Sequence, residues 1–328
     1  MSQLSKGRNR RGRQSQRNHQ KHDKGGFFRS KMLLLFALIA FSMVTVLYGP
    51  YDGFRIFWIT TAMHTSDHQF LAKLIYSQKT INQVMQGNVV IALDERSSPL
   101  VNISKEKNDT IERIEVEVAS GDGFLLKIHD PARVSVACSD KAQGQLLEEI
   151  SSSNQAVAAT NASAYQANQQ KGLPLGLVIS DSKIINQGLD PRHSIIGLNQ
   201  KNELVLGIYF DWDLDQLALR DAVEYGPFLI INGKKAGITG NGGGLAPRTA
   251  IGQTEDGSIL LLVIDGRKLE TFGATMKDVQ DVLFDHGAIN AACLDGGASV
   301  SMFFEGQIIN SVNSKEENRK LPNAFIVQ

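Results

Sequence analysis

Two short apolar segments that each end at an Asp-Gly pair limit the folds open to this chain. Residues 259–264 read ILLLVI and stop at Asp265-Gly266, and residues 291–294 read AACL and stop at Asp295-Gly296. Short apolar runs bounded by turn residues are typical of buried strands, and glycine lets a ligand approach the backbone closely. Each carboxylate is therefore expected at the mouth of a sheet. For either pair taken alone, a plain turn is the alternative.

Arginines lie on both sides of the first of these apolar segments. Arg248 belongs to residues 247–252 (PRTAIG), and Arg267 directly follows the Asp265-Gly266 pair. A guanidinium group presents a planar fork of donors that matches the oxygens of a phosphate or carboxylate. Two carboxylates and two arginines near strand ends favour a binding or catalytic site over chance turns.

These motifs carry a family resemblance. The segments PRTAIG (247–252), DGR (265–267) and LDGGAS (294–299) resemble the signature of the phosphodiester glycosidase domain. The similarity extends to YGPFLIING (225–233) and LGLVIS (175–180), and covers roughly residues 120–328. The best-known member of the family, the lysosomal uncovering enzyme, removes N-acetylglucosamine from a mannose-phosphate diester. Bacterial relatives are associated with exopolysaccharide metabolism.

The resemblance and the residue chemistry together suggest roles at a site. Carboxylates tolerate positive charge at an anomeric carbon, and guanidinium groups stabilise a leaving phosphate. Asp265 and Asp295 are the carboxylate candidates, with Arg248 as the first choice for the phosphate, Arg267 the second and Arg319 the third. Backbone N–H groups of a glycine turn can also face a ligand. The further substrate-binding candidates are Asn161, Thr249, Gly296, Gly297 and Ser299.

Structural roles are the alternatives for several of these residues. Arg248 could pair with an aspartate simply because buried charges need partners, and Ser299 could be a helix cap. Ser163 and Ala164, which follow Asn161-Ala162, and Ala298 stand where the family usually has glycine. If position 298 needs a positive φ, alanine there costs about 1 kcal/mol. These departures motivate a non-catalytic glycan-binding protein as the alternative function.

The formal charge of zero hides a strong asymmetry along the chain. Residues 1–31 hold ten of the 34 Lys and Arg and one of the 34 Asp and Glu, which gives +9. The remaining 24 basic and 33 acidic residues give −9. The charged head is expected to be disordered. The rest has no basic run suited to nucleic acid, so no nucleic-acid partner is expected.

An uncharged run of 17 residues, 32–48, directly follows the basic head. At about 1.5 Å per residue a helix of this length reaches about 26 Å, enough for a thin or adapted bilayer. The basic head predicts a cytoplasmic tail and an extracellular remainder by the positive-inside rule. A cleaved signal peptide and a buried core helix are the alternatives, although residues 48–51 lack a small-residue cleavage site.

Apolar spacing sets the expected order of elements. Residues 67–88 are expected to form one helix, acting as a stalk or lid, and the polar residues 94–110 a linker. Helices are also expected at 145–152 and 214–222. The best-defined helix lies between the two Asp-Gly pairs, where Thr275 and Asp278 form a capping pair and Gly287 can close it. His286 then ends this helix and is not a ligand.

Strands fill most of the remaining chain from residue 111 onward. Alternating apolar residues between turns, such as the hairpin signal Asn232-Gly233, indicate antiparallel pairing. The glycine-rich residues 240–244 lack the Gly-Lys-Ser/Thr of a phosphate-binding P-loop and indicate a substrate loop or a flexible connection. The predicted fold is α+β, a mixed, largely antiparallel sheet core with flanking helices, preceded by one N-terminal transmembrane helix.

The predicted domains are a basic cytoplasmic tail (1–31), a transmembrane anchor (32–50), a helical stalk and linker (51–110) and a phosphodiester glycosidase-like domain (111–328). Cys138 and Cys293 could form a disulfide in an exported chain, or Cys293 could be a buried thiol. No metal and no cofactor are expected, and the oligomeric state is open. The expected function is extracytoplasmic hydrolysis of a sugar-1-phosphodiester in a surface or exopolysaccharide-type glycan. A polysaccharide-assembly protein of the same fold is the other alternative.

Overall fold

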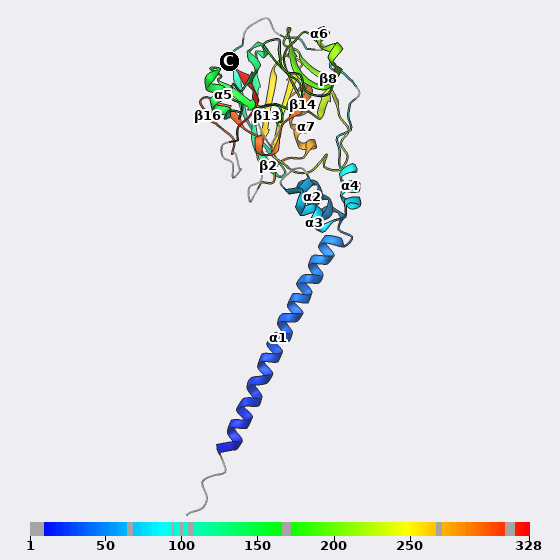
Figure 1. Ribbon diagram of the computed structural model, residues 1–328, viewed down its shortest axis with the longest axis vertical. Coiled ribbons are helices and arrows are strands. Elements are labelled where there is room, and N and C mark those ends of the chain that lie inside the picture. The colour runs from blue at the N-terminus through cyan, green and yellow to red at the C-terminus, as the bar shows by residue number, and fades with distance from the viewer. Residues whose placement is uncertain are drawn as a thin grey trace, which may run out of the picture. The chain divides into compact units, whose positions relative to one another are not determined.

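The computed structural model (Figure 1) describes, with side chains from residue 29 onward, residues 10–63, 68–93, 95–98, 101–103, 108–165, 172–266, 271–311 and 319–328. Two compact units make up the chain, residues 1–58 and residues 59–328. The first is built on one long helix and the second on three sheets.

The helix of the first unit, α1 (Arg10–Tyr48), contains the apolar run noted in the sequence. Its last 20 residues, Arg29–Tyr48, are long and apolar enough to cross a membrane, a test that a signal sequence also passes. At about 1.5 Å per residue they extend about 30 Å, the thickness of a bilayer core. The expectation of a disordered head differs from the structure at residues 10–31, which continue the same helix.

The second unit consists mostly of strands with a few short helices. Its helices are α2 (Asp52–Met63, which begins in the first unit), α3 (Gln69–Ile75), α4 (Gln78–Gln86), α5 (Leu147–Ser153), α6 (Leu214–Leu217) and α7 (Met276–Asp285). Three-residue 3-10 turns are η2 (Pro131–Arg133), η3 (Asp211–Asp213) and η4 (Gly297–Ser299).

All strand pairings in the three sheets are antiparallel, in agreement with the predicted α+β fold. The seven-stranded sheet has the order β1 (Ile111–Val118), β2 (Gly121–Ile128), β13 (Ile259–Ile264), β12 (Arg248–Thr254), β14 (Ala288–Leu294), β10 (Phe228–Ile231) and β11 (Lys234–Lys235). The second sheet has the order β16 (Gln307–Ile308), β15 (Met302–Phe304), β4 (Ala158–Asn161), β17 (Asn323–Val327) and β3 (Val134–Cys138). The third has the order β6 (Lys183–Asn186), β5 (Val178–Ser180), β9 (Leu219–Glu224), β7 (Arg192–Asn199) and β8 (Leu204–Phe210).

Strand β13 shows why its sequence is apolar at every position instead of alternating. Ile259, Leu261 and Val263 enter a central core to which strands of all three sheets contribute. The intervening side chains enter a second core beneath α7. Successive side chains of a strand point to opposite faces, so a strand covered on both faces must be apolar throughout. Figure 1 shows β13 and β14 within the sheets, with α7 beside β14.

The two flanking helices are placed by their own sequence signals. For α7, the Thr275 hydroxyl accepts a hydrogen bond from the Asp278 N–H (3.1 Å), and the Asp278 carboxylate accepts one from the Thr275 N–H (2.8 Å). The predicted capping box is therefore present, and His286 ends the helix with its ring nitrogen 2.8 Å from the Val282 carbonyl. On the second sheet, α5 packs Leu147 and Ile150 into a separate apolar cluster.

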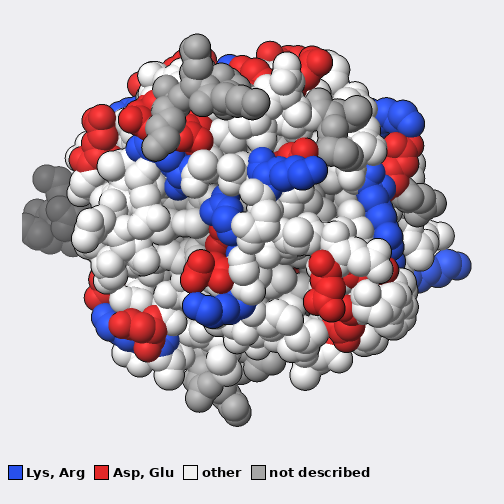
Figure 2. All heavy atoms as spheres, turned by 90° about the horizontal axis from the view of Figure 1, so that it is seen from above, with Lys and Arg blue, Asp and Glu red and all other residues white. Residues whose placement is uncertain are grey.

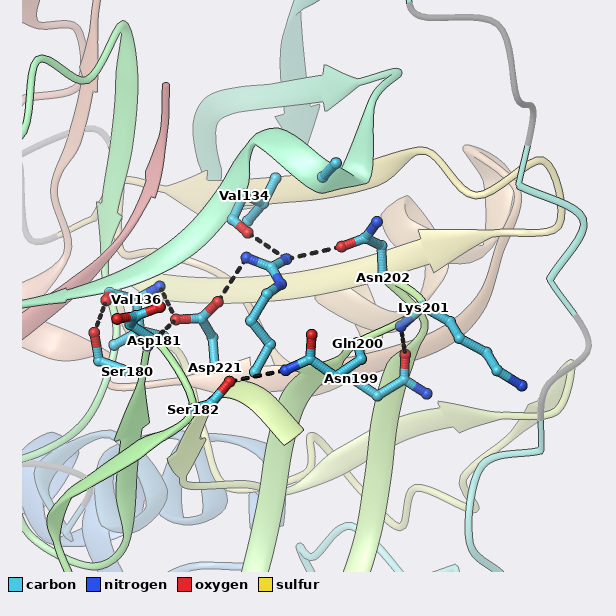
Figure 3. Close-up of polar contacts among 12 residues, drawn as sticks. Val134, Val136, Ser180, Asp181, Ser182, Asn199, Gln200, Lys201, Asn202 and Asp221 are labelled. Carbon is cyan, nitrogen blue, oxygen red and sulfur yellow. Dashed lines mark hydrogen bonds and ion pairs between the residues drawn. The ribbon is translucent and has the colours of Figure 1, made fainter. Parts of the chain in front are cut away.

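Hydrogen bonds from two side chains of β9, Arg220 and Asp221, join the third sheet to the edge strand β3 of the second sheet (Figure 3). Arg220 donates to the buried Asp221 carboxylate (2.7 Å) and to the Val134 carbonyl (2.8 Å), while Asp221 accepts from the Val136 N–H (3.0 Å). The Ser180 hydroxyl donates to the Val136 carbonyl (2.7 Å). Side chains of the third sheet thus satisfy the edge of β3, whose backbone groups no further strand pairs.

Two predicted helices differ from the structure. Residues 67–88 form α3 and α4 instead of one helix, because Ser77 is extended and its hydroxyl caps α4 through the Thr80 N–H (3.2 Å). Residues 214–222 form the short α6 and then β9, with the left-handed Ala218 (φ 48°) between them. Strand β9 is paired on both sides, by β5 and β7, and this pairing overrides the local helical preference.

The polar residues expected to be a linker are packed against the sheets where the structure describes them. The N–H groups of Ser97 and Asn102 donate to the carbonyls of Leu206 and Glu255 (both 2.8 Å). The Ser97 hydroxyl accepts from the Leu206 N–H (2.7 Å). The polar side chains of this segment therefore serve backbone hydrogen bonding, and the segment belongs to the second unit.

The two cysteines are free thiols, so Cys293 is a buried thiol and does not form the disulfide with Cys138 that the sequence left open. Cys293 is buried with its sulfur 3.4 Å from that of Met276, and burial raises the pKa of its thiol to about 12. Burial, with a smaller contribution from the charge of Asp221, raises the pKa of the Cys138 thiol to about 11. Both thiols stay protonated near neutral pH, so neither is an activated nucleophile.

Removal of the Asp221 carboxylate should weaken the contact between the second and third sheets and lower the free energy of unfolding. In Asp221→Ala, the buried Val136 N–H loses its acceptor and Arg220 keeps only its other acceptors, so the free energy of unfolding should fall by about 1–3 kcal/mol. Urea unfolding of the full chain in detergent measures this, with the exposed Glu117→Ala as a control expected within about 0.5 kcal/mol of wild type. A loss below about 1 kcal/mol for Asp221→Ala would show that Asp221 does not join the sheets.

Candidate active site

Strand β12 brings the two predicted carboxylates to one edge of the seven-stranded sheet. It pairs with β13 on one side, where Arg248 lies opposite Ile264, and with β14 on the other, where Thr249 lies opposite Leu294. Because both neighbours run antiparallel to β12, both end where β12 begins. Asp265 and Asp295 directly follow these two ends. With strands spaced about 4.8 Å apart, the two chain ends lie about 10 Å from each other.

Asp295 is a half-buried carboxyl group held in a polar shell. The Tyr225 hydroxyl donates a hydrogen bond to Oδ1 of Asp295 (3.3 Å), and the backbone N–H of Asp295 donates to the Ala162 carbonyl (2.9 Å). The Ser299 hydroxyl is buried beside this carboxyl, at a geometry outside that of an ordinary hydrogen bond.

The groups around Asp295 shift the pKa of its side-chain carboxyl. Burial raises the pKa of the carboxyl, and Ser299, the Arg319 charge, Tyr225 and the Gly296 N–H oppose the rise without cancelling it. Tyr225 remains the proton donor, because burial above all, together with the Asp295 charge, raises the pKa of its phenol. A carboxyl with a raised pKa is suited to proton transfer near neutral pH.

Asn161 joins the second sheet to the edge that carries Asp295. Its Nδ2 donates to the Asp295 carbonyl, and its Oδ1 accepts from the Thr249 hydroxyl (2.8 Å) and the Ser301 N–H (3.2 Å). Asn161 and Thr249 are 0% and 1% exposed. The structure thus gives both residues a bracing position beneath the site, and their predicted contact with substrate stays a prediction.

Asp265 and Arg248 are buried at the same edge, each 3% exposed. The Asp265 carboxylate accepts hydrogen bonds from the Asn310 amide (2.8 Å) and the Ser311 N–H (2.7 Å). Arg248 donates to the carbonyls of Ala274 (3.1 Å) and Gly244 (2.7 Å). Its charge also reaches Tyr225, lowering the pKa of a phenol that burial raises. Arg248 therefore lies close to the shell of Asp295 but deep in the protein.

The glycine turn after β14 differs from the prediction in detail. The Gly297 N–H donates to the Pro247 carbonyl (2.9 Å), so it is not turned toward a ligand, and the Gly296 N–H serves the Asp295 carboxyl. The left-handed residue is Gly297 (φ 65°), and Ala298 is not among the residues with positive φ. The departure from the family pattern at position 298 therefore carries no backbone strain. Arg267 lies outside the described residues.

A pocket of about 310 Å³ opens beside this edge. Its lining includes Ser299 next to Asp295, Asn310, which holds Asp265, and the half-buried Arg319. The Arg319 guanidinium lies 5.0 Å from the centre of the Tyr165 ring, a cation–π distance. The full lining is Leu146, Leu147, Glu148, Ala298, Ser299, Ser301, Ile308, Asn310 and Arg319. The arginine ranked third from the sequence is thus the one that lines the pocket.

Sequence reasoning missed three residues of this site: Tyr225, Asn310 and Glu148. Tyr225 begins the YGPFLIING segment and could have been selected on that ground. Asn310 and Glu148 have no motif of their own, since one follows a hairpin and the other lies in the first turn of a short helix. Their place at the pocket depends on how β15, β16 and α5 pack.

The described parts of the chain show neither a cluster of metal ligands nor, on the face in Figure 2, a continuous basic patch. Within those ranges, no three His, Cys, Asp or Glu side chains gather in an arrangement that could hold a metal ion. The prediction that no metal or cofactor is needed stays a prediction. On the face in Figure 2, the Lys and Arg of the described residues lie interspersed with Asp and Glu and form no continuous basic patch.

The family model for the phosphodiester glycosidase domain matches residues 154–328, more than half of the chain. This region contains β4 through β17 and therefore most of the candidate site. Among curated proteins, the SPbeta prophage-derived protein YomE of Bacillus subtilis (strain 168) is 42% identical over 67 residues. That match spans 20% of this chain and 10% of YomE, so this chain corresponds to a small part of that relative.

Solved structures are similar to this chain at low sequence identity. The zebrafish N-acetylglucosamine-1-phosphodiester alpha-N-acetylglucosaminidase catalytic domain, auto-inhibited by its pro-peptide, shares the fold with a TM-score of 0.59 and 19% identity. The match covers 71% of this chain and 87% of that domain. A protein from Synechocystis matches with a TM-score of 0.47 and 17% identity, over 66% of this chain and 62% of that one.

Substitution of Asp295 by asparagine should not destabilise the protein at neutral pH. The folded-state pKa lies above the unfolded value of about 3.9, so the native state binds more protons between the two values and stability falls as pH rises through them. Asn removes this penalty while keeping the shape of the side chain. The melting temperature of Asp295→Asn relative to wild type should be equal or higher at pH 7, and the difference should shrink below about pH 4. A variant less stable than wild type at about pH 7 and equal at about pH 4 would show a stabilising charge instead.

Proposed function

The chain belongs to the phosphodiester glycosidase family, and from this premise we propose that it hydrolyses the glycosidic bond of a sugar-1-phosphodiester. The observation that carries the proposal is the meeting of Asp265 and Asp295 at one sheet edge, beside a pocket lined by Arg319. We further propose that the substrate belongs to a surface or exopolysaccharide-type glycan and that the pocket binds its terminal sugar. A volume of about 310 Å³ is at the small end of ligand pockets, which favours one sugar unit over a long chain segment.

The proposed chemistry gives each charged group a separate role. Water attacks the anomeric carbon, its proton passes to the Asp295 carboxylate, and the bond from that carbon to the phosphate oxygen breaks. The electron pair leaves with the phosphate, so the products are a free sugar and a phosphomonoester. A raised pKa makes Asp295 a stronger base than an ordinary carboxylate.

The other charged groups stabilise the transition state. Asp265, fixed by Asn310 and Ser311, supplies negative charge against the developing positive charge of the sugar. Arg319 stabilises the departing phosphate, because its guanidinium lines the pocket whereas that of Arg248 is buried. Arg248 then acts as a second, deeper positive charge.

Loss of the Asp295 charge should slow turnover strongly without loss of folding. For Asp295→Asn, kcat should fall by about 10²–10⁴-fold, the range for lost acid–base catalysis. The assay uses a methyl or aryl phosphodiester of N-acetylglucosamine and measures released sugar. The matched control is Glu255→Gln, an exposed change in the turn at the far end of β12, which should keep wild-type kcat.

Two results would count against the hydrolase. If wild type and Asp295→Asn both bind the glycan and neither releases sugar, the protein is a glycan-binding module. If Asp295→Asn retains more than about a tenth of wild-type kcat, proton transfer at this carboxyl is not part of the reaction.

We also propose that Arg29–Tyr48 is a retained single-pass anchor with a cytoplasmic N-terminus. The +9 charge of residues 1–31 supports this orientation through the positive-inside rule. Protease added outside intact cells should then cleave residues beyond about 60 and spare the tail, as detected with tags at both termini. Recovery of a soluble mature form that begins near residue 50 would show a cleaved signal sequence.

A further inference from the structure

The pocket beside Asp295 has a lining of mixed chemistry. The apolar lining residues are Leu146, Leu147, which is 3% exposed, and Ile308, and the polar ones include Asn310 and Arg319. A pyranose ring is likewise amphipathic, with C–H groups on its faces and hydroxyl groups at its edge. Such a lining suits one sugar ring, because it offers aliphatic contacts for the C–H groups and polar side chains for the hydroxyl groups.

Glu148 is the acidic member of the pocket lining. It follows Leu147 in the first turn of α5, whose orientation is fixed by the buried Leu147 and Ile150. The next residue, Glu149, has a structural role, because its carboxylate accepts from the Leu146 N–H (3.1 Å) and lies 3.4 Å from the Lys141 ammonium group. Glu148, by contrast, makes no hydrogen bond or ion pair with any residue that the structure describes.

The two charged residues of the lining, Arg319 and Glu148, differ in their contacts. The Arg319 charge lowers the pKa of the Asp295 carboxyl, and its guanidinium lies 5.0 Å from the centre of the Tyr165 ring. The Glu148 side chain is exposed in the part of the lining that α5 contributes. An ionised carboxylate accepts hydrogen bonds and donates none, and a second negative charge beside it is disfavoured.

We infer that Glu148 selects the sugar by charge: the pocket takes a pyranoside that presents hydroxyl or amine N–H donors and rejects a uronate. This inference rests on the proposed function, because it places the sugar of the phosphodiester in this pocket. Glu148 acts in discrimination between substrates and takes no part in bond cleavage.

Glu148→Gln tests the inference, because glutamine keeps the size of the side chain and removes its charge. Two matched substrates are the methyl phosphodiesters of N-acetylglucosamine and of glucuronic acid, each linked through the anomeric phosphate. In the full chain in detergent, the ratio of kcat/KM for the uronate to that for the N-acetylhexosamine should rise at least about tenfold in Glu148→Gln. Glu255→Gln makes the same chemical change at an exposed turn and should leave the ratio unchanged.

Binding measurements keep this inference separate from the proposed hydrolysis. Calorimetric titration with the 1-phosphates of the two sugars gives their Kd values without turnover, and Glu148→Gln should tighten the uronate at least about tenfold relative to the other sugar. If wild type cleaves neither diester but this binding ratio shifts, the hydrolase proposal fails and the selection by Glu148 stands. If the binding and kinetic ratios stay within about twofold of wild type, Glu148 does not select the sugar.

Discussion

The pairing of β12 with β13 on one side and β14 on the other is the constraint on which the site depends. Antiparallel pairing on both sides makes the two outer strands end together, so residues 30 positions apart in the chain meet at one edge. Both faces of this sheet are covered, by the central core and by α7. A shift of one residue in either register would turn the side chains that follow to the opposite face, so the cores that fix the register also fix the carboxylates.

Side-chain hydrogen bonds hold the second sheet to the other two. Asn161 at the end of β4 joins it to the first through the Asp295 carbonyl and Thr249, while Arg220 and Asp221 of the third sheet satisfy the edge of β3. These groups are polar and buried, and buried polar groups are stable where their partners are present. The polar residues around the site therefore also hold the protein together, which is why folding and activity must be measured separately for each variant.

Burial and charge are balanced differently at the two aspartates. Asp265 is enclosed and receives two hydrogen bonds, whereas Asp295 is half-buried and keeps a raised pKa despite Ser299, Tyr225 and Arg319. Two carboxyls in unlike environments can take unlike roles in one reaction. The pocket adds an arginine from the C-terminal segment and a glutamate from α5, so the chemistry draws on segments far apart in the sequence.

The sequence by itself determined the strand ends at Asp265 and Asp295, the α7 capping box, the apolar segment of α1 and the family. These are local signals, set by turn residues, helix caps and apolar runs. Tertiary structure alone decided that the second half of residues 214–222 becomes strand, that the polar segment after α4 packs on the sheets and that Arg319, instead of Arg248, lines the pocket. It also decided that Asn161 is a brace and that Tyr225, Asn310 and Glu148 belong to the site. The physical reason is that pairing between distant strands and burial of side chains are properties of the packed chain, which local residue patterns do not encode.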